Sequence, residues 1–202
     1  MTMWRGHTPL ILASQSRARQ VLLGNAGIVV EAIPANLDEQ AARQDAAPAS
    51  AGKIAAFLAR RKAIAVSMLE TNRYVVGADQ TLVLGERLFA KPLDRAAAVE
   101  QLRALAGRIH ELYSAVAVAY DGKILFQNTA SARMTMRALS DLEIAAYLDE
   151  AGEAVMSSVG AYQVEGLGVH LFERIEGDHF TILGLPLLPL LAFFRSRHLL
   201  AV

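Results

Sequence analysis

The feature that most constrains the fold is a pair of long alternating segments that follow each other directly. Apolar residues alternate in the fashion of a strand from 109 to 119 and again from 123 to 136, and Asp121-Gly122 stands between the two runs. Strict alternation is typical of a half-buried β-strand, and Asp-Gly between two such runs predicts a tight hairpin. The chain is therefore expected to form a sheet that contains one long antiparallel hairpin.

Shorter apolar runs and helical patterns alternate in the rest of the chain. Strands are expected at 10–13, 28–33, 74–84 and 169–175, and helices at about 14–26, 49–69, 94–106, 140–150 and 186–197, with a loop at 34–48. Ser14 or Ser16, Asp94 and Ser140 are suited to cap three of these helices. The pattern predicts an α/β fold, a mixed twisted sheet covered by helices. Because no repeat or linker interrupts the 202 residues, we expect a single domain over residues 1–202.

Composition excludes several classes of protein. Lys plus Arg and Asp plus Glu number 20 each, so the chain has no overall field to hold a nucleic acid. Cys is absent, which excludes disulfides, thiolate catalysis and zinc sites built on Cys. The longest apolar stretch, 180–194, contains two prolines and a glycine and predicts a buried strand end followed by a core helix. We expect no membrane association and a cytoplasmic location.

Asp79 is the strongest candidate for a functional residue. It lies in Val75-Val76-Gly77-Ala78-Asp79-Gln80-Thr81-Leu82, with strand-like apolar residues on both sides. A carboxylate in such surroundings is costly unless a cation, a metal or several donors meet it. Lys91, held by Pro92, follows shortly after. We interpret the pair as part of a site for phosphate and metal, and a buried structural ion pair is the alternative.

Three further segments carry candidate residues. Ser14-Gln15-Ser16-Arg17-Ala18-Arg19 lies where a buried strand meets a helix N-terminus, which favours anions, although an ordinary cap with solvated arginines fits as well. Lys62, on the long helix, either extends past apolar neighbours to solvent or points into a cleft. The glycines of 160–168 allow a backbone to approach a ligand, or form a tight turn. Glu39 stands in an acidic loop.

These segments together resemble the Maf family of nucleoside triphosphate pyrophosphatases, also called septum formation inhibitors. The resemblance covers nearly the whole chain and rests on the order and spacing of short motifs. They are Leu12-Ala13-Ser14-Gln15-Ser16 with Arg19, Gly77-Ala78-Asp79, Lys91-Pro92, Leu105-Ala106-Gly107-Arg108-Ile109-His110, Gly160-Ala161-Tyr162, Glu165-Gly166-Leu167-Gly168, Glu173-Arg174-Ile175-Glu176-Gly177-Asp178 and Gly184-Leu185-Pro186-Leu187.

The resemblance implies a fold of two lobes around a deep cleft, and hydrolysis of a nucleotide between its α and β phosphates. It implies a divalent cation, Mg²⁺ or Mn²⁺, held by Asp79 and Glu39, which also handle the attacking water. Ser14, Arg19, Lys62 and Lys91 would contact phosphate. Two carboxylates suit a hard cation, and neutralising the charge of a triphosphate is what such a cleavage requires.

Two positions bear on the substrate and one motif departs from the family. Gln80 and Glu165 resemble the subgroup that acts on 7-methyl-GTP, whereas enzymes for dTTP and UTP usually carry Thr and Gln there. The family's Ser-Pro-Arg-Arg reads Ser16-Arg17-Ala18-Arg19 here, so Arg17 replaces a proline and Ala18 an arginine. The alternatives are a dTTP or UTP pyrophosphatase, and a nucleotide-sensing interaction protein that regulates septation without turnover. A homodimer is an option that the sequence leaves open.

Overall fold

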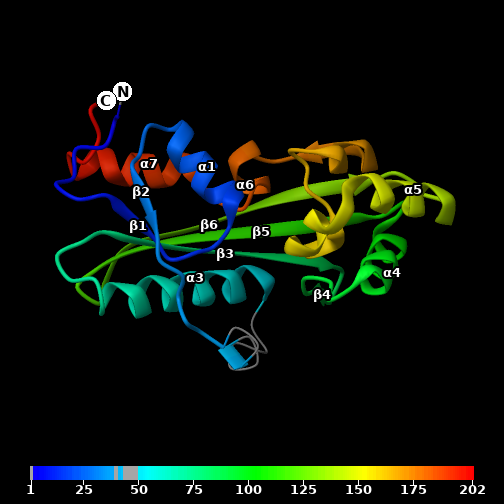
Figure 1. Ribbon diagram of the computed structural model, residues 1–202, viewed down its shortest axis with the longest axis horizontal. Coiled ribbons are helices and arrows are strands. Elements are labelled where there is room, and N and C mark those ends of the chain that lie inside the picture. The colour runs from blue at the N-terminus through cyan, green and yellow to red at the C-terminus, as the bar shows by residue number, and fades with distance from the viewer. Residues whose placement is uncertain (1, 39–40, 43–49) are drawn as a thin grey trace. The chain divides into compact units, whose positions relative to one another are not determined.

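The computed structural model shows a mixed α/β fold (Figure 1). The structure describes residues 2–38, 41–42 and 50–202. The sheet has seven strands in the order β2-β1-β3-β5-β6-β7, with β4 paired to β3. β1 runs parallel to both β2 and β3, whereas β4 and β7 pair antiparallel with their neighbours, so the sheet is mixed as the sequence predicted. The strands are β1 (Leu10–Leu12), β2 (Val30–Ala32), β3 (Val75–Leu84), β4 (Arg87–Phe89), β5 (Ile109–Tyr120), β6 (Lys123–Met136) and β7 (Phe172–Glu176).

Six α-helices and three short 3-10 helices occur in the part of the chain that the structure describes. The α-helices are α1 (Arg17–Asn25), α3 (Ala51–Ser67), α4 (Arg95–Leu105), α5 (Asp141–Ala151), α6 (His179–Ile182) and α7 (Leu187–Ser196), and the 3-10 helices are η1 (Gly152–Ser157), η2 (Val159–Ala161) and η3 (Leu167–Leu171). None of the helices among the described residues has the length and apolar character needed to cross a membrane.

Side-chain caps explain where several helices begin. Ser16 accepts a hydrogen bond from the backbone N–H of Arg19, and Asp94 accepts one from Ala97. Ser140 and Glu143 form a reciprocal capping box at the start of α5. Each cap satisfies a backbone donor that the first helical turn leaves without a partner. The three predicted starts are therefore confirmed, and Ser16 rather than Ser14 is the cap of α1.

The predicted hairpin is confirmed and joins β5 to β6. Its turn residues Asp121 and Gly122 both have positive φ values, 47° and 74°. A two-residue turn with positive φ at both positions matches the right-handed twist of the flanking strands, which is why Asp-Gly is favoured there.

In the last third of the chain one predicted strand starts later than expected and one predicted strand end is a helix. The strand expected at 169–175 begins only at Phe172, because Leu167–Leu171 forms η3 after a turn in which Gly166 and Gly168 both donate to the carbonyl of Gln163. The strand end expected near Phe180 is the short helix α6. Side chains of Ser114 and Gln80, rather than a neighbouring strand, bind the carbonyl groups of this segment.

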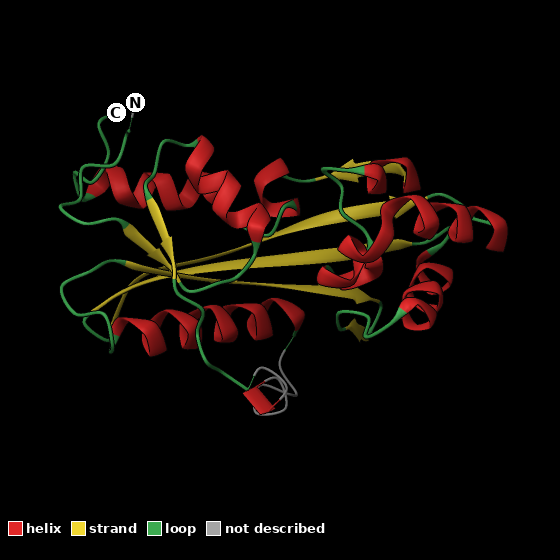
Figure 2. Ribbon diagram, viewed as in Figure 1, coloured by secondary structure: helices red, strands yellow, loops and turns green. Residues whose placement is uncertain are grey.

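The described chain divides into two compact units, and β3, β5 and β6 contribute residues to both. The first unit comprises Met1–Gln80, Tyr113–Ala130 and His179–Val202. In it, α1 and α7 cover one face of the strands and α3 covers the other (Figures 1 and 2). Leu23 and Phe194 pack with Leu12, Ala78 and Val116 on the first face. Small residues let α3 approach the second face closely, where Ala55, Ala59 and Ala63 meet Ala115, Ala117 and Ala119.

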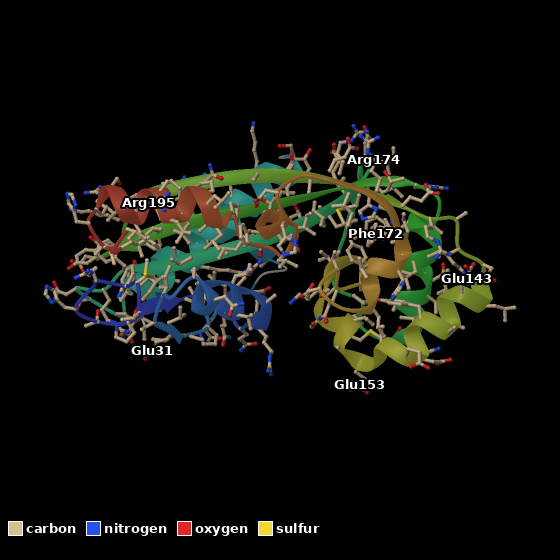
Figure 3. The ribbon with its side chains drawn as sticks, turned by 90° about the horizontal axis from the view of Figure 1, so that it is seen from above. Glu31, Glu143, Glu153, Phe172, Arg174 and Arg195 are labelled. Carbon is tan, nitrogen blue, oxygen red and sulfur yellow. The ribbon has the colours of Figure 1, made fainter. Side chains whose placement is uncertain are left out.

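The second unit comprises Thr81–Leu112 and Ser131–Asp178. Ion pairs join α4 to α5 on its surface, Arg95 with Asp149 and Arg103 with Asp141. On β7, the ring of Phe172 packs inside the unit against Tyr162, whereas Arg174 extends outward (Figure 3).

Candidate functional site

The junction between β1 and α1 places two serines and one arginine together. The hydroxyl of Ser14 accepts hydrogen bonds from the backbone N–H of Ser16 at 3.2 Å and from Nη1 of Arg19 at 3.1 Å. The buried guanidinium of Arg19 also donates to the carbonyl oxygens of Ala78 at 3.0 Å and Gly184 at 2.8 Å. Five N–H donors in a rigid plane suit a guanidinium to this bridging position, and a fixed cation beside a helix N-terminus favours an anion.

Asp79 forms a buried salt bridge with Lys62. The ammonium Nζ donates to Oδ1 at 2.8 Å, and the two residues are only 7% and 4% exposed. The side chain of Lys62 is therefore buried and does not extend to solvent. The sequence allowed a buried ion pair of Asp79 with Lys91, whereas the ion pair seen here joins Asp79 to Lys62.

Gly77 explains why α3 can bring Lys62 to this strand. A Cβ atom at Gly77 would lie 2.1 Å from the carbonyl oxygen of Ala59 and 2.6 Å from the backbone nitrogen of Ala63. Any other residue would push α3 away from β3. Because side chains alternate along a strand, Gly77 and Asp79 lie on the same face of β3. Lys62 lies between Ala59 and Ala63 on α3, so the close approach of the helix at Gly77 brings Lys62 next to Asp79.

Two cationic groups from opposite faces therefore meet neighbouring residues of β3. Arg19 reaches the carbonyl of Ala78 from α1, and Lys62 reaches the carboxylate of Asp79 from α3. β1 pairs with β3 only at Val75 and Val76, so β3 continues past the end of β1 at this point. The arrangement brings two cationic groups and one carboxylate together at a position of the sheet beyond the end of β1.

Gln80 faces the side of the sheet opposite Asp79 and belongs to a network of buried polar groups. Its Nε2 donates to Ser114 Oγ at 3.0 Å, to the carbonyl of Ile182 at 3.0 Å and to that of Thr181 at 3.3 Å. Ser114 Oγ in turn donates to the Thr181 carbonyl at 2.7 Å. The sequence did not single out Ser114 or Thr181, and the one signal was a serine directly before the apolar run 115–119 of β5. Gly184 was noted only as part of a motif.

The second unit holds two more of the predicted site residues, Lys91 and Glu165, and both side chains are exposed. Glu165 lies in the turn that follows Tyr162, whose hydroxyl is 2.8 Å from Nε2 of His110. Burial lowers the pKa of His110 to about 4, so its imidazole is neutral near pH 7. Burial also raises the pKa of Tyr147 to about 12, and the charge of Glu165 adds to that effect. The roles of Lys91 and Glu165 stay predictions.

The metal prediction rests on Asp79 and Glu39, and Glu39 lies outside the described residues. Among the residues that are described, no three His, Cys, Asp or Glu side chains gather so as to hold a metal ion. The carboxylate of Asp79 still suits magnesium, because that ion is usually held by one or two carboxylates together with phosphate oxygens and waters. Asp79 is such a carboxylate, and a triphosphate would bring the phosphate oxygens.

Comparison with known proteins places the chain in a family. The model of the Maf-like protein family matches residues 9–197. A nucleoside triphosphate pyrophosphatase of Bradyrhizobium diazoefficiens is 63% identical over all of both chains. A 7-methyl-GTP pyrophosphatase of Rhizobium etli is 50% identical over 93% of this chain and 95% of its own. The chain therefore belongs to the Maf family, as its motifs predicted, and the prediction of an enzyme of the nucleoside triphosphate pyrophosphatase class is confirmed.

The likeness to solved structures is distant. The Staphylococcus aureus Ham1 protein matches with a TM-score of 0.36 and 14% identity over 66% of this chain and 73% of its own. At that distance the likeness carries nothing about the site.

Proposed function

We propose that this nucleoside triphosphate pyrophosphatase prefers 7-methyl-GTP and cleaves it between the α and β phosphates. The proposal depends above all on one observation, the meeting of Arg19 and Lys62 with the adjacent residues Ala78 and Asp79 of β3. Two buried cations and one carboxylate within the same unit are the groups that a polyanionic substrate and an attacking water need.

In this proposal Asp79 is the general base. Water attacks the α phosphorus, the bond from that phosphorus to the bridging oxygen breaks, and pyrophosphate leaves with the bonding electron pair. The proton of the water passes to the carboxylate of Asp79. Lys62, at 2.8 Å from Oδ1, fixes the position of this carboxylate, and a positioned base contributes roughly 10²–10⁴-fold to such rates.

Phosphate binding is assigned to Ser14, Arg19, Lys62 and Lys91. The hydrogen bonds of Arg19 to Ala78 and Gly184 hold its guanidinium in place before substrate arrives, so little side-chain freedom is lost on binding. Asp79 and Glu39 are the residues proposed to hold a divalent cation, and such a cation would neutralise charge that develops on the phosphate oxygens.

Base preference is assigned to Gln80 and Glu165. A carboxylate accepts hydrogen bonds only, which suits the N1–H and exocyclic amine of guanine and a positively charged methylated ring. The Rhizobium etli relative, named a 7-methyl-GTP pyrophosphatase, supports the assignment. The alternative without turnover loses support, because the relatives are named as enzymes.

A pyrophosphate-release assay with 7-methyl-GTP, GTP, dTTP and UTP tests the proposal, with and without Mg²⁺ or Mn²⁺. We expect the highest kcat/KM for 7-methyl-GTP and no turnover without a divalent cation. Asp79→Asn keeps the shape of the side chain and should abolish release while the protein stays folded. A preference for dTTP or UTP would reject the base assignment, and normal turnover by Asp79→Asn would show that Asp79 is structural.

A further inference from the structure

The side-chain amide of Gln80 has its orientation decided by its neighbours in the first unit. Its Nε2 lies within 3.0 to 3.3 Å of three oxygen atoms, those of Ser114, Thr181 and Ile182. An amide nitrogen carries two hydrogens and an amide oxygen carries none. If the group were turned over, Oε1 would face two backbone carbonyl oxygens, and both hydrogen bonds would be replaced by repulsion.

The hydroxyl of Ser114 is a third group that fixes the same orientation, and it also holds the carbonyl of Thr181 in place. Ser114 is fully buried in β5, and its single hydrogen is donated to the carbonyl of Thr181 at 2.7 Å. Ser114 Oγ can therefore only accept from Gln80, at 3.0 Å, and so requires a nitrogen there. A hydroxyl that had its hydrogen available would accept either orientation of the amide.

The carbonyl oxygen of Gln80 points the other way, toward Gly184. A Cβ atom at Gly184 would lie 3.6 Å from Oε1 of Gln80 and 3.4 Å from Nη2 of Arg19. Gly184 has a φ of +93°, a conformation that disfavours other residues, so the space beside both groups is kept by the backbone itself. Gln80 is only partly buried, in contrast to Ser114 and Thr181.

We infer that Ser114 is a positioning residue that fixes Gln80 with its carbonyl oxygen, not its NH₂ group, toward the substrate, and thereby favours a purine whose edge carries N–H donors over one that lacks them. The inference rests on the proposed role of Gln80 in base preference. Guanine offers two such donors, N1–H and the exocyclic amine. A base without these donors would leave the carbonyl oxygen of Gln80 without a hydrogen bond. An unpaired polar group is costly, so such a base loses more binding free energy than the one missing hydrogen bond contributes.

Kinetics with matched nucleotides tests the selection. ITP lacks the exocyclic amine of GTP, and 2-aminopurine riboside triphosphate lacks the N1–H together with the 6-oxo group. We expect Gln80→Met and Ser114→Ala to lower the preference for GTP over at least one of these by about tenfold, or about 1.4 kcal/mol. Ser67→Ala is the matched control, because Ser67 is also fully buried and also donates to a carbonyl, that of Ile64. It should lose stability without a change in base preference.

Gln80→Glu and amide NMR test the orientation independently of turnover. A glutamate at position 80 keeps one oxygen toward the substrate but places a second oxygen against the carbonyls of Thr181 and Ile182. The Gln80→Glu variant should therefore have a lower Tm than Gln80→Met at pH 8, and it should keep the preference for GTP. The amide protons of Gln80 should exchange slowly and stay unshifted when α,β-methylene-GTP binds.

Three results would overturn the inference: amide protons that shift strongly on nucleotide binding, a Gln80→Glu variant as stable as wild type, or a Ser114→Ala variant with unchanged preference. If no nucleoside triphosphate is hydrolysed by the wild type, the proposed function fails, whereas NMR and melting still decide the orientation of Gln80.

Discussion

Replacing Lys62 with Met separates the structural role of the buried ion pair from its catalytic role. Met has nearly the length of Lys and no charge, so the variant leaves the carboxylate of Asp79, 4% exposed, without the ammonium that lies 2.8 Å from Oδ1. Removing one partner of a buried pair typically costs about 3–5 kcal/mol, because a buried charge stays behind. For a chain of this size that corresponds to a fall in Tm of about 6–20 °C.

The double variant Lys62→Met with Asp79→Asn sharpens the test. It removes both charges, so most of the lost stability should return, since replacing a whole buried pair is often neutral. Hydrolysis should not return, because the general base is gone. Thermal unfolding and pyrophosphate release are measured on the two single variants, the double variant and Lys53→Met. Lys53 is exposed on the same helix, so its substitution should leave both readouts nearly unchanged.

The reasoning is refuted if Lys62→Met melts like wild type and keeps its kcat/KM. Loss of stability with full activity would instead make the pair purely structural. Loss of activity without loss of stability would mean that Asp79 finds enough solvent or other donors to tolerate the missing ammonium group.

Three further predictions concern other parts of the chain. Arg17→Ala should leave kcat/KM nearly unchanged, because Arg17 lies in the first turn of α1 and its side chain points about 100° around the helix from the position of Ala18; weaker triphosphate binding would show that Arg17 replaces the arginine missing there. Gln80→Thr with Glu165→Gln should shift the kcat/KM ratio from 7-methyl-GTP toward dTTP or UTP, and a wild type that already prefers pyrimidines would reject it. Stability should fall by up to about 3 kcal/mol between pH 6.5 and 4, since burial lowers the pKa of His110 to about 4 and only the unfolded chain gains the proton in that range. Urea unfolding should show that the free energy of unfolding of the His110→Phe variant changes much less with pH across that range than that of the wild type.

Features that depend on neighbouring residues could be read from the sequence. The Asp121-Gly122 hairpin, the caps at Ser16, Asp94 and Ser140, and the long helix α3 all follow from contacts within a few positions along the chain. Asp79 was recognised for the same reason, since a carboxylate in an apolar strand is costly wherever the strand lies.

Contacts between distant residues were decided only by the tertiary structure. Asp79 takes Lys62, 17 residues earlier, as its salt-bridge partner, and Arg19 bonds Gly184, 165 residues away. The orientation of the Gln80 amide depends on Ser114 and the carbonyl of Ile182, 34 and 102 residues along the chain. Alternation along β3 is readable from sequence, but which helix covers which face is not, because that depends on how the whole sheet is assembled. The sequence thus determined which residues carry charge and polarity, and packing of the helices on the sheet determined which of them meet.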